Sequence, residues 1–208
     1  MNRLADLFAA TADGVFPPLD GIVEVVPRPT PLRLEAVIEF TAHAVVATSL
    51  SPTEVLAQGY DAYGGIVSPD FLRWLAQPGG EIGCHDAVLV SQGTGHSTLR
   101  ARSDLDDHPR VVASRRRRTE VTVYGNERGL ITVGRGLANR WETSVELFEA
   151  TPGSRGAGRA LIAEAVGQVP ENEPVFASVA PGNAASLRAF LACGFVPIGA
   201  EVIIHPGR

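Results

Sequence analysis

The amino-acid sequence has no lysine, few cysteines and no long apolar run. Its 208 residues contain no uninterrupted apolar stretch of the roughly 18 residues that a membrane-spanning helix needs, so no such helix is expected. The two cysteines, Cys84 and Cys193, form no CxxC pair, which argues against a disulfide framework and predicts a reduced, cytoplasmic setting. Residues 1–16 carry one arginine and two aspartates around a short apolar patch, and they make a poor signal peptide.

The composition is that of a soluble globular protein, with 45% hydrophobic and 20% charged residues. A net charge of −5 and an isoelectric point near 5.5 argue against nucleic acid as the main partner. The length fits one domain, or one domain with an embellishment.

The first part of the chain predicts short elements separated by proline and glycine. A helix carrying Leu4, Leu7 and Phe8 is expected to end before Pro17, and residues 21–26 have the pattern of a strand. Residues 34–48 are rich in β-branched side chains, which predicts either one long or bent strand or two consecutive strands.

Two serine–proline pairs predict helix starts, because Ser51 and Ser68 can cap a helix whose first position is proline. Residues 87–90 then form a short apolar run that predicts a buried strand. Residues 93–118 are polar and rich in turn formers. They end in four arginines, 115–118, which are expected in a solvated loop or at a strand edge.

Residues 119–208 have a more regular pattern. Residues 119–124 and 130–133 predict a hairpin with a turn at Gly125-Asn126, and residues 143–149 predict a third strand. A helical stripe follows, then a strand at 175–179, a helix that Gly194 ends, and a final strand. The strand–helix–strand unit from 143 to 179 should be a right-handed crossover with parallel strands, which predicts an α/β fold.

A glycine-rich turn between the third strand and its helix is a candidate anion site, because glycines let the backbone approach a ligand and the first helical N–H groups are free. A Walker loop would need lysine and a hydroxyl where the chain has Arg159-Ala160. A dinucleotide fingerprint starting at Gly156 would need glycine where the chain has Leu161. A plain turn with no ligand also stays open.

Two motifs, in the right order, match a known family. Residues 155–160, Arg-x-x-Gly-x-Ala, resemble the pyrophosphate loop of the GNAT superfamily of acyl-coenzyme A-dependent N-acyltransferases, with Pro152 ahead of it as in that family. Residues 183–195 resemble the family's second element, with Asn183, Ser186 and Phe190 followed by Gly-Phe. The resemblance is firm over 119–208, and residues 1–118 would be an elaborated acceptor-side portion of a single domain spanning 1–208.

The resemblance implies a GNAT fold (α+β), with a mixed central sheet splayed between two parallel strands and flanked by helices. It implies acetyl-coenzyme A as co-substrate. The arginines at 115–118 would then have a second possible role, at the 3′-phosphate of coenzyme A or at an acidic acceptor. The residues implied to bind the cofactor come from the third strand, the loop and the second element: Leu147, Phe148, Ala150, Arg155, Gly156, Ala157, Gly158, Arg159, Ala160, Asn183, Ser186 and Phe190.

The chemistry implied is direct attack of a primary amine on the acetyl thioester, with no metal and no covalent enzyme intermediate. A base must remove a proton from the amine, and the candidates on the third strand are Glu146 and Glu149. Phe190 stands where the family often has a tyrosine that protonates the leaving thiolate. The acceptor would be a small-molecule or peptide amine, neither nucleic acid nor membrane.

Two rival functions remain at this stage. One is a non-catalytic GNAT-fold module that binds acyl-coenzyme A as a ligand or regulator, and the other is a phosphate-binding enzyme of another class. A homodimer is also conceivable, formed by pairing of the β-rich segment 201–204 across two chains.

Overall fold

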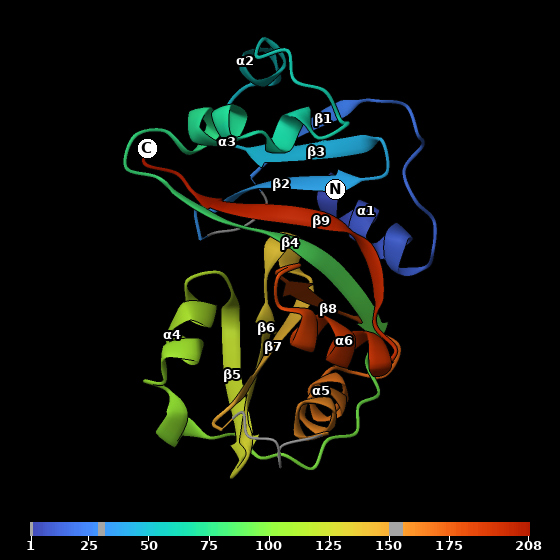
Figure 1. Ribbon diagram of the computed structural model, residues 1–208, viewed down its shortest axis with the longest axis vertical. Coiled ribbons are helices and arrows are strands. Elements are labelled where there is room, and N and C mark those ends of the chain that lie inside the picture. The colour runs from blue at the N-terminus through green and yellow to red at the C-terminus, as the bar shows by residue number, and fades with distance from the viewer. Residues whose placement is uncertain (1, 29–31, 150–155) are drawn as a thin grey trace. The chain divides into compact units, whose positions relative to one another are not determined.

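A computed structural model describes residues 2–28, 32–149 and 156–208 of the chain (Figure 1). The chain divides into two compact units: unit 1 comprises residues 1–88 and 198–208, and unit 2 comprises residues 89–197. Among the described residues, no helix is long and apolar enough to cross a membrane. The assignment of 1–208 to a single domain stays a prediction.

Unit 1 is a mixed sheet with helices. Its elements are α1 (Arg3–Ala12), β1 (Val23–Pro27), β2 (Glu35–Phe40), β3 (His43–Thr48), α2 (Pro52–Leu56), the 3₁₀ turn η1 (Gly65–Val67), α3 (Pro69–Ala76), the first part of β4 (Glu81–Gln92) and most of β9 (Val196–His205). β1 pairs with β3 in parallel, whereas β2 pairs antiparallel with both β3 and β9. The predicted mixed α+β class is therefore already visible in this unit.

The helix starts of unit 1 follow from local chemistry. Ser51 caps α2 in a capping box with Glu54, and Ser68 caps α3 by accepting the backbone N–H of Phe71. Both predicted starts are confirmed. The β-branched run at 34–48 forms two strands, and Ala42 turns the chain between them with φ +53°.

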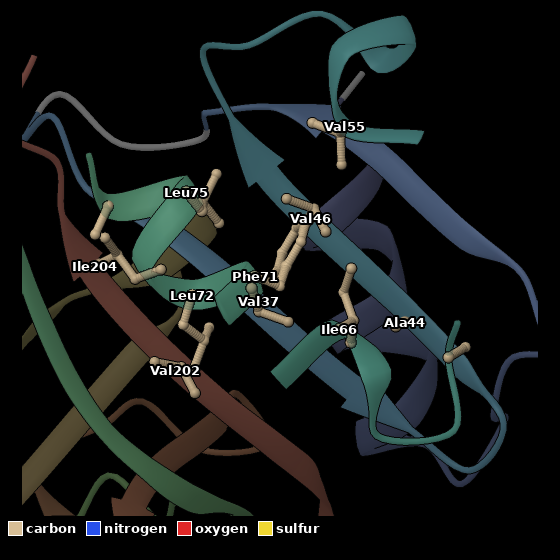
Figure 2. Close-up of a cluster of buried hydrophobic side chains, with 12 residues drawn as sticks. Val37, Ala44, Val46, Val55, Ile66, Phe71, Leu72, Leu75, Val202 and Ile204 are labelled. Atoms are coloured by element: carbon tan, nitrogen blue, oxygen red, sulfur yellow. The ribbon is translucent and has the colours of Figure 1, made fainter. Parts of the chain in front are cut away.

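The core of unit 1 lies between its sheet and α3 (Figure 2). Val37, Val46 and Val202 come from three strands, and Phe71 and Leu75 come from α3. All except Val202, at 1% exposure, are fully buried. Side chains on one face of the strands thus meet the apolar stripe of α3, and side chains on the other face, such as Ile38 and Val45, are also fully buried.

β9 has no free edge for the dimer contact considered above. Its residues 200–204 pair antiparallel with β2, and the strand order places β4 on its other side. The proposed pairing of segment 201–204 across two chains is therefore wrong, because both rows of its backbone groups face strands of the same chain. The oligomeric state itself stays a prediction.

A buried carboxylate in unit 1 depends on Arg208. Glu35 is fully buried, and it accepts hydrogen bonds from Thr48 Oγ1 at 2.9 Å and from Arg208 Nη2 at 2.5 Å. We predict that Arg208→Ala lowers the free energy of unfolding by about 1–3 kcal/mol, because a buried acceptor loses its only cationic donor among the described contacts. Urea denaturation measures this, with exposed Arg73→Ala as the control; an unchanged midpoint would show that water replaces the guanidinium at no cost.

Unit 2 carries most of the predicted crossover. Its elements are the end of β4, the 3₁₀ turn η2 (Ser103–Leu105), α4 (Pro109–Arg115), β5 (Thr119–Asn126), β6 (Gly129–Arg135), the 3₁₀ turn η3 (Leu137–Asn139), β7 (Trp141–Leu147), α5 (Ala157–Gly167), β8 (Pro174–Val179), α6 (Ala184–Ala192) and the start of β9. β5, β6 and β7 form an antiparallel meander, and β7 pairs with β8 in parallel. The parallel pairing predicted for the crossover is confirmed.

Two features of unit 2 differ from expectation. The hairpin strands continue through Gly125-Asn126, and the turn is made by residues 127–128. The polar stretch 93–118 contains a helix, α4, whose Val111 is fully buried against Val123 and Leu130. One buried valine produces too weak an apolar period to predict a helix of this length from sequence.

Candidate active site

β7 and β8 separate along most of their length. The parallel pairing consists of Trp141↔Val175 and Glu142↔Phe176, although β7 continues to Leu147 and β8 to Val179. Over the described residues, the last part of β7 therefore has β6 on one side and no ladder to β8 on the other. This separation is the splay that the sequence implied.

The register of β7 decides which of its backbone groups face this opened edge. Phe148 donates its N–H to the carbonyl oxygen of Arg128 at 3.0 Å, so its backbone faces β6. Along an antiparallel strand, residues that hydrogen-bond to the neighbouring strand alternate with residues that do not. In the register of β7 with β6, Glu146 is of the first kind, like Phe148, and Leu147 is of the second. The backbone groups of Leu147 and Val145 therefore point away from β6, and they can pair with an extended ligand that carries amide groups.

The next described element after β7 is α5, which begins at Ala157. Gly156 caps the helix in the left-handed conformation, with φ +88° and no side-chain hydrogen bond to the first turn. The N–H of Ala160 bonds to the carbonyl of Gly156 at 2.9 Å, and within the described part of the chain the N-cap residue offers no side-chain cap to the N–H groups of Ala157, Gly158 and Arg159. These groups and the helix dipole favour an anion here.

Two glycines at the start of α5 leave room for a ligand, because they have no side chains. Of the residues that the structure describes, a Cβ on Gly158 would meet only the Leu147 side chain, at 4.0 Å, and a Cβ on Gly156 would meet none within 4 Å. Two of the residues implied to bind the cofactor, Ala150 and Arg155, lie outside the described residues, as does Pro152. Binding by the loop stays a prediction.

The second motif forms the start and the buried face of α6. Asn183 caps this helix, and its Oδ1 accepts the backbone N–H of Ser186 at 3.1 Å. Phe190 is buried, and its ring meets that of Phe195 edge-on, with centroids 4.9 Å apart. The structure thus gives Phe190 a packing role, and contact with a cofactor stays a prediction for all three motif residues.

β7 presents different chemistry on its two faces. Val145 and Leu147 pack with Leu161 and Ala165 of α5, which lies on one side of the meander. Ser144 and the glutamates at 142 and 146 point to the other side, where α4 lies (Figure 1). The apolar face anchors α5, whereas the two charged side chains of β7, Glu142 and Glu146, lie on the face toward α4.

Three pairs of side chains connect α4 and its C-terminal turn to β7, and we call them the polar ladder. They are Arg110 with Glu146 (Nε to Oε2, 2.6 Å), Ser114 with Ser144 (Oγ to Oγ, 3.4 Å) and Arg118 with Glu142 (Nε to Oε2, 2.9 Å). Four helical residues rise about 6 Å and two strand residues about 7 Å, so every fourth residue from 110 meets every second residue of β7. Arg118 lies beyond the end of α4, but it keeps the helical spacing because its N–H donates a hydrogen bond to the Ser114 carbonyl at 3.0 Å.

The inner end of the ladder is a buried ion-pair cluster. Glu142 also accepts Arg140 Nε at 2.8 Å and the backbone N–H of Leu137 at 3.1 Å. Burial raises the pKa of Glu142, but the charges of Arg140 and Arg118 outweigh it, so the net pKa lies below the ordinary value. A side chain at Gly136 would collide with this carboxylate. Glu142 is thus held ionised and fixed.

The outer end of the ladder is accessible. The side chains of Arg110 and Glu146 are 44% and 35% exposed, against 11% and 9% for Arg118 and Glu142. Phe148, 40% exposed, lies beside them with its ring 5.9 Å from that of His108. Of the two predicted bases, Glu146 therefore faces α4 in this exposed cluster. Glu149 follows the end of β7 and is exposed.

Sequence reasoning missed the partners of Glu146 because it missed α4. Arg110, Ser114 and Arg118 lie four residues apart, and this spacing on a polar helix was the available signal. The arginines at 115–118 were expected in solvent, yet Arg118 lies in the ladder and only 11% of its side chain is exposed. Among the described residues, no group of three or more His, Cys, Asp or Glu side chains is arranged to hold a metal ion.

No family model matches the sequence, and no curated protein matches it either. Among solved structures, the fold is similar to a GCN5-related N-acetyltransferase from Kribbella flavida, with 14% identity, a TM-score of 0.48, and coverage of 100% of this chain and 95% of that one. A GNAT-family protein from Novosphingobium aromaticivorans, described as an acetyltransferase, shows 19% identity and a TM-score of 0.39 over 63% of this chain and 69% of its own.

A conserved protein of unknown function from Staphylococcus epidermidis shows 14% identity and a TM-score of 0.39 over 66% of each chain. At these identities and scores the likenesses carry no conclusion about activity.

Proposed function

We propose that the protein is an N-acyltransferase of the GNAT type, which moves an acetyl group from acetyl-coenzyme A to a primary amine. The observation that carries this proposal is the separation of β7 from β8 beside the uncapped N-terminus of α5. An opened strand edge suits an amide-bearing arm, and a helix N-terminus suits a pyrophosphate. Together with the two sequence motifs, this combination favours coenzyme A over other phosphate ligands.

In this proposal the pantetheine arm pairs with the backbone of Val145 and Leu147, which faces away from β6. The N–H groups of Ala157, Gly158 and Arg159 hold the pyrophosphate, and the Arg159 side chain adds a charge-assisted contact. In this proposal the arm runs back along β7 from the loop, and the acyl group lies within reach of the Glu146 side chain, on the face toward α4.

The chemistry follows from that placement. The amine arrives protonated, Glu146 accepts the proton, and the nitrogen lone pair attacks the thioester carbonyl carbon. The C–N bond forms, the C–S bond breaks, the electron pair leaves on the sulfur of coenzyme A, and the nitrogen gives up its second proton to solvent. Because Phe190 is a buried phenyl ring, it donates no proton, and the thiolate leaves as such or takes a proton from solvent.

Glu146→Gln tests the base. We expect kcat to fall by about 100-fold or more, the usual contribution of a general base, with little change in coenzyme A affinity. Steady-state kinetics and a coenzyme A titration separate the two effects. Glu149→Gln is the matched control on the same segment; if it, and not Glu146→Gln, removes activity, Glu149 is the base.

The overall proposal is tested by incubating the protein with acetyl-coenzyme A and a panel of primary amines while free thiol is measured. Amine-dependent thiol release supports it. A rise in melting temperature with coenzyme A and no thiol release would show the alternative, a non-catalytic module that binds acyl-coenzyme A. If millimolar coenzyme A changes neither quantity, both functions are excluded.

A further inference from the structure

We propose that the outer pair of the polar ladder, Arg110 with Glu146, recognises the acceptor, and that the acceptor carries a carboxylate close to its amine, as an amino acid does. This inference rests on the proposed function, because it assigns a substrate class to the same site. It goes beyond that function by naming an anion-binding residue on α4 and the chemical group that it selects.

The first argument is the gradient of burial along the ladder. The inner pair, Arg118 with Glu142, is nearly buried, whereas Arg110 and Glu146 are 44% and 35% exposed. An exposed ion pair contributes little stability, so a ligand can exchange for it at small cost. The inner pair cannot exchange, because each partner would be left charged in a buried place. Only the outer pair combines charge with access.

The second argument is charge complementarity. Glu146 attracts the ammonium group of an acceptor and Arg110 attracts an anion, and their present contact of 2.6 Å places the two charges side by side. When an acceptor with an ammonium and a carboxylate a few bonds apart binds, the Arg110–Glu146 ion pair is replaced by two ion pairs. Glu146 then pairs with the ammonium group and Arg110 with the carboxylate. An acceptor with only an amine would leave Arg110 without the partner that it has in the free protein.

The third argument is rigidity. Arg110 belongs to α4, which is fixed on β6 and β7 by Ser114, whose hydroxyl lies 3.0 Å from Thr132 Oγ1, and by buried Val111. The position of the guanidinium relative to β7 is therefore set by the helix and not by a loop. A carboxylate bound there orients the amine toward Glu146 and the thioester, and transfer gives an N-acetyl amino acid, free coenzyme A thiol and one proton.

The experiment compares the α-amino acids with their primary amides, in which the carboxylate charge is removed, using thiol release from acetyl-coenzyme A. We expect kcat/KM for an accepted amino acid to exceed that for its amide by about tenfold or more, the usual weight of a charge-assisted contact. In Arg110→Gln the ratio of the two kcat/KM values should fall to about one, mainly because KM for the amino acid rises. Arg110→Lys should restore part of the ratio. Arg102→Gln, which breaks another exposed ion pair of unit 2, should keep the ratio.

The outcomes are separable. If amides and amino acids react equally well, or if Arg110→Gln lowers both rates by the same factor in a variant with unchanged melting temperature, the recognition role is wrong and the acyltransferase proposal stands. If no amine releases thiol although coenzyme A binds, the proposed function fails, and this inference fails with it.

Discussion

Replacing Gly158 with glutamate is expected to abolish coenzyme A binding while leaving the protein folded. The new carboxylate would lie in the first turn of α5, where the uncapped N–H groups are proposed to hold the pyrophosphate. Two like charges at one site cost several kcal/mol, which corresponds to an affinity loss of about 100-fold or more. Calorimetric titration with coenzyme A measures the loss.

The fold should tolerate this change for two reasons. Among the described residues, a Cβ at position 158 would have only the Leu147 side chain as a neighbour, at 4.0 Å, and an acidic residue in the first helical turn interacts favourably with the helix dipole. Gly158→Ala is the matched control, because it adds a side chain without charge. Affinity retained in Gly158→Glu, with a normal melting temperature, would remove the assignment of the loop.

Glu142→Ala is expected to cause the largest loss of stability, about 3–5 kcal/mol in the free energy of unfolding. The carboxylate neutralises Arg140 and Arg118, whose side chains are 3% and 11% exposed, and removing it leaves buried positive charge. Chemical denaturation measures the effect. Glu127→Ala, at an exposed turn of unit 2, should stay within about 0.5 kcal/mol of the wild type.

The same group predicts a pH dependence. The folded-state pKa of Glu142 lies below the ordinary value of 4.5, because the two guanidiniums outweigh its burial. Its stabilising contribution is therefore fully present above about pH 4.5 and is lost as the pH falls through the depressed value. Glu142→Gln should flatten this acid limb. An unchanged slope of stability against pH between 5 and 3 would mean that Glu142 is not the group responsible.

Much of unit 2 could be predicted from sequence because local chemistry and tertiary packing agree there. The stripe of Leu161, Ile162 and Ala165 is buried on the sheet as its spacing indicates, and Gly194 ends α6 with φ +85°. The separation of β7 and β8 was implied by the two motifs and is visible as the early end of their pairing.

The polar face of the site was not predictable in the same way. Glu146 was a candidate base on the predicted third strand, but nothing local distinguishes it from Glu142, a buried carboxylate four residues earlier. The difference comes from α4, whose side chains reach β7 across 24 to 36 residues of sequence. A helix with one buried apolar residue leaves almost no periodic signal, so Arg110 and Arg118 could be placed only by the structure.

The most direct test of the account is a crystal structure of the protein with coenzyme A. We expect pantetheine along the backbone of Val145 and Leu147, and the pyrophosphate at the N–H groups of residues 157–159. We also expect the thiol end to lie within reach of Glu146. Coenzyme A bound away from β7, or density for the pyrophosphate anywhere other than the N-terminus of α5, would contradict the account.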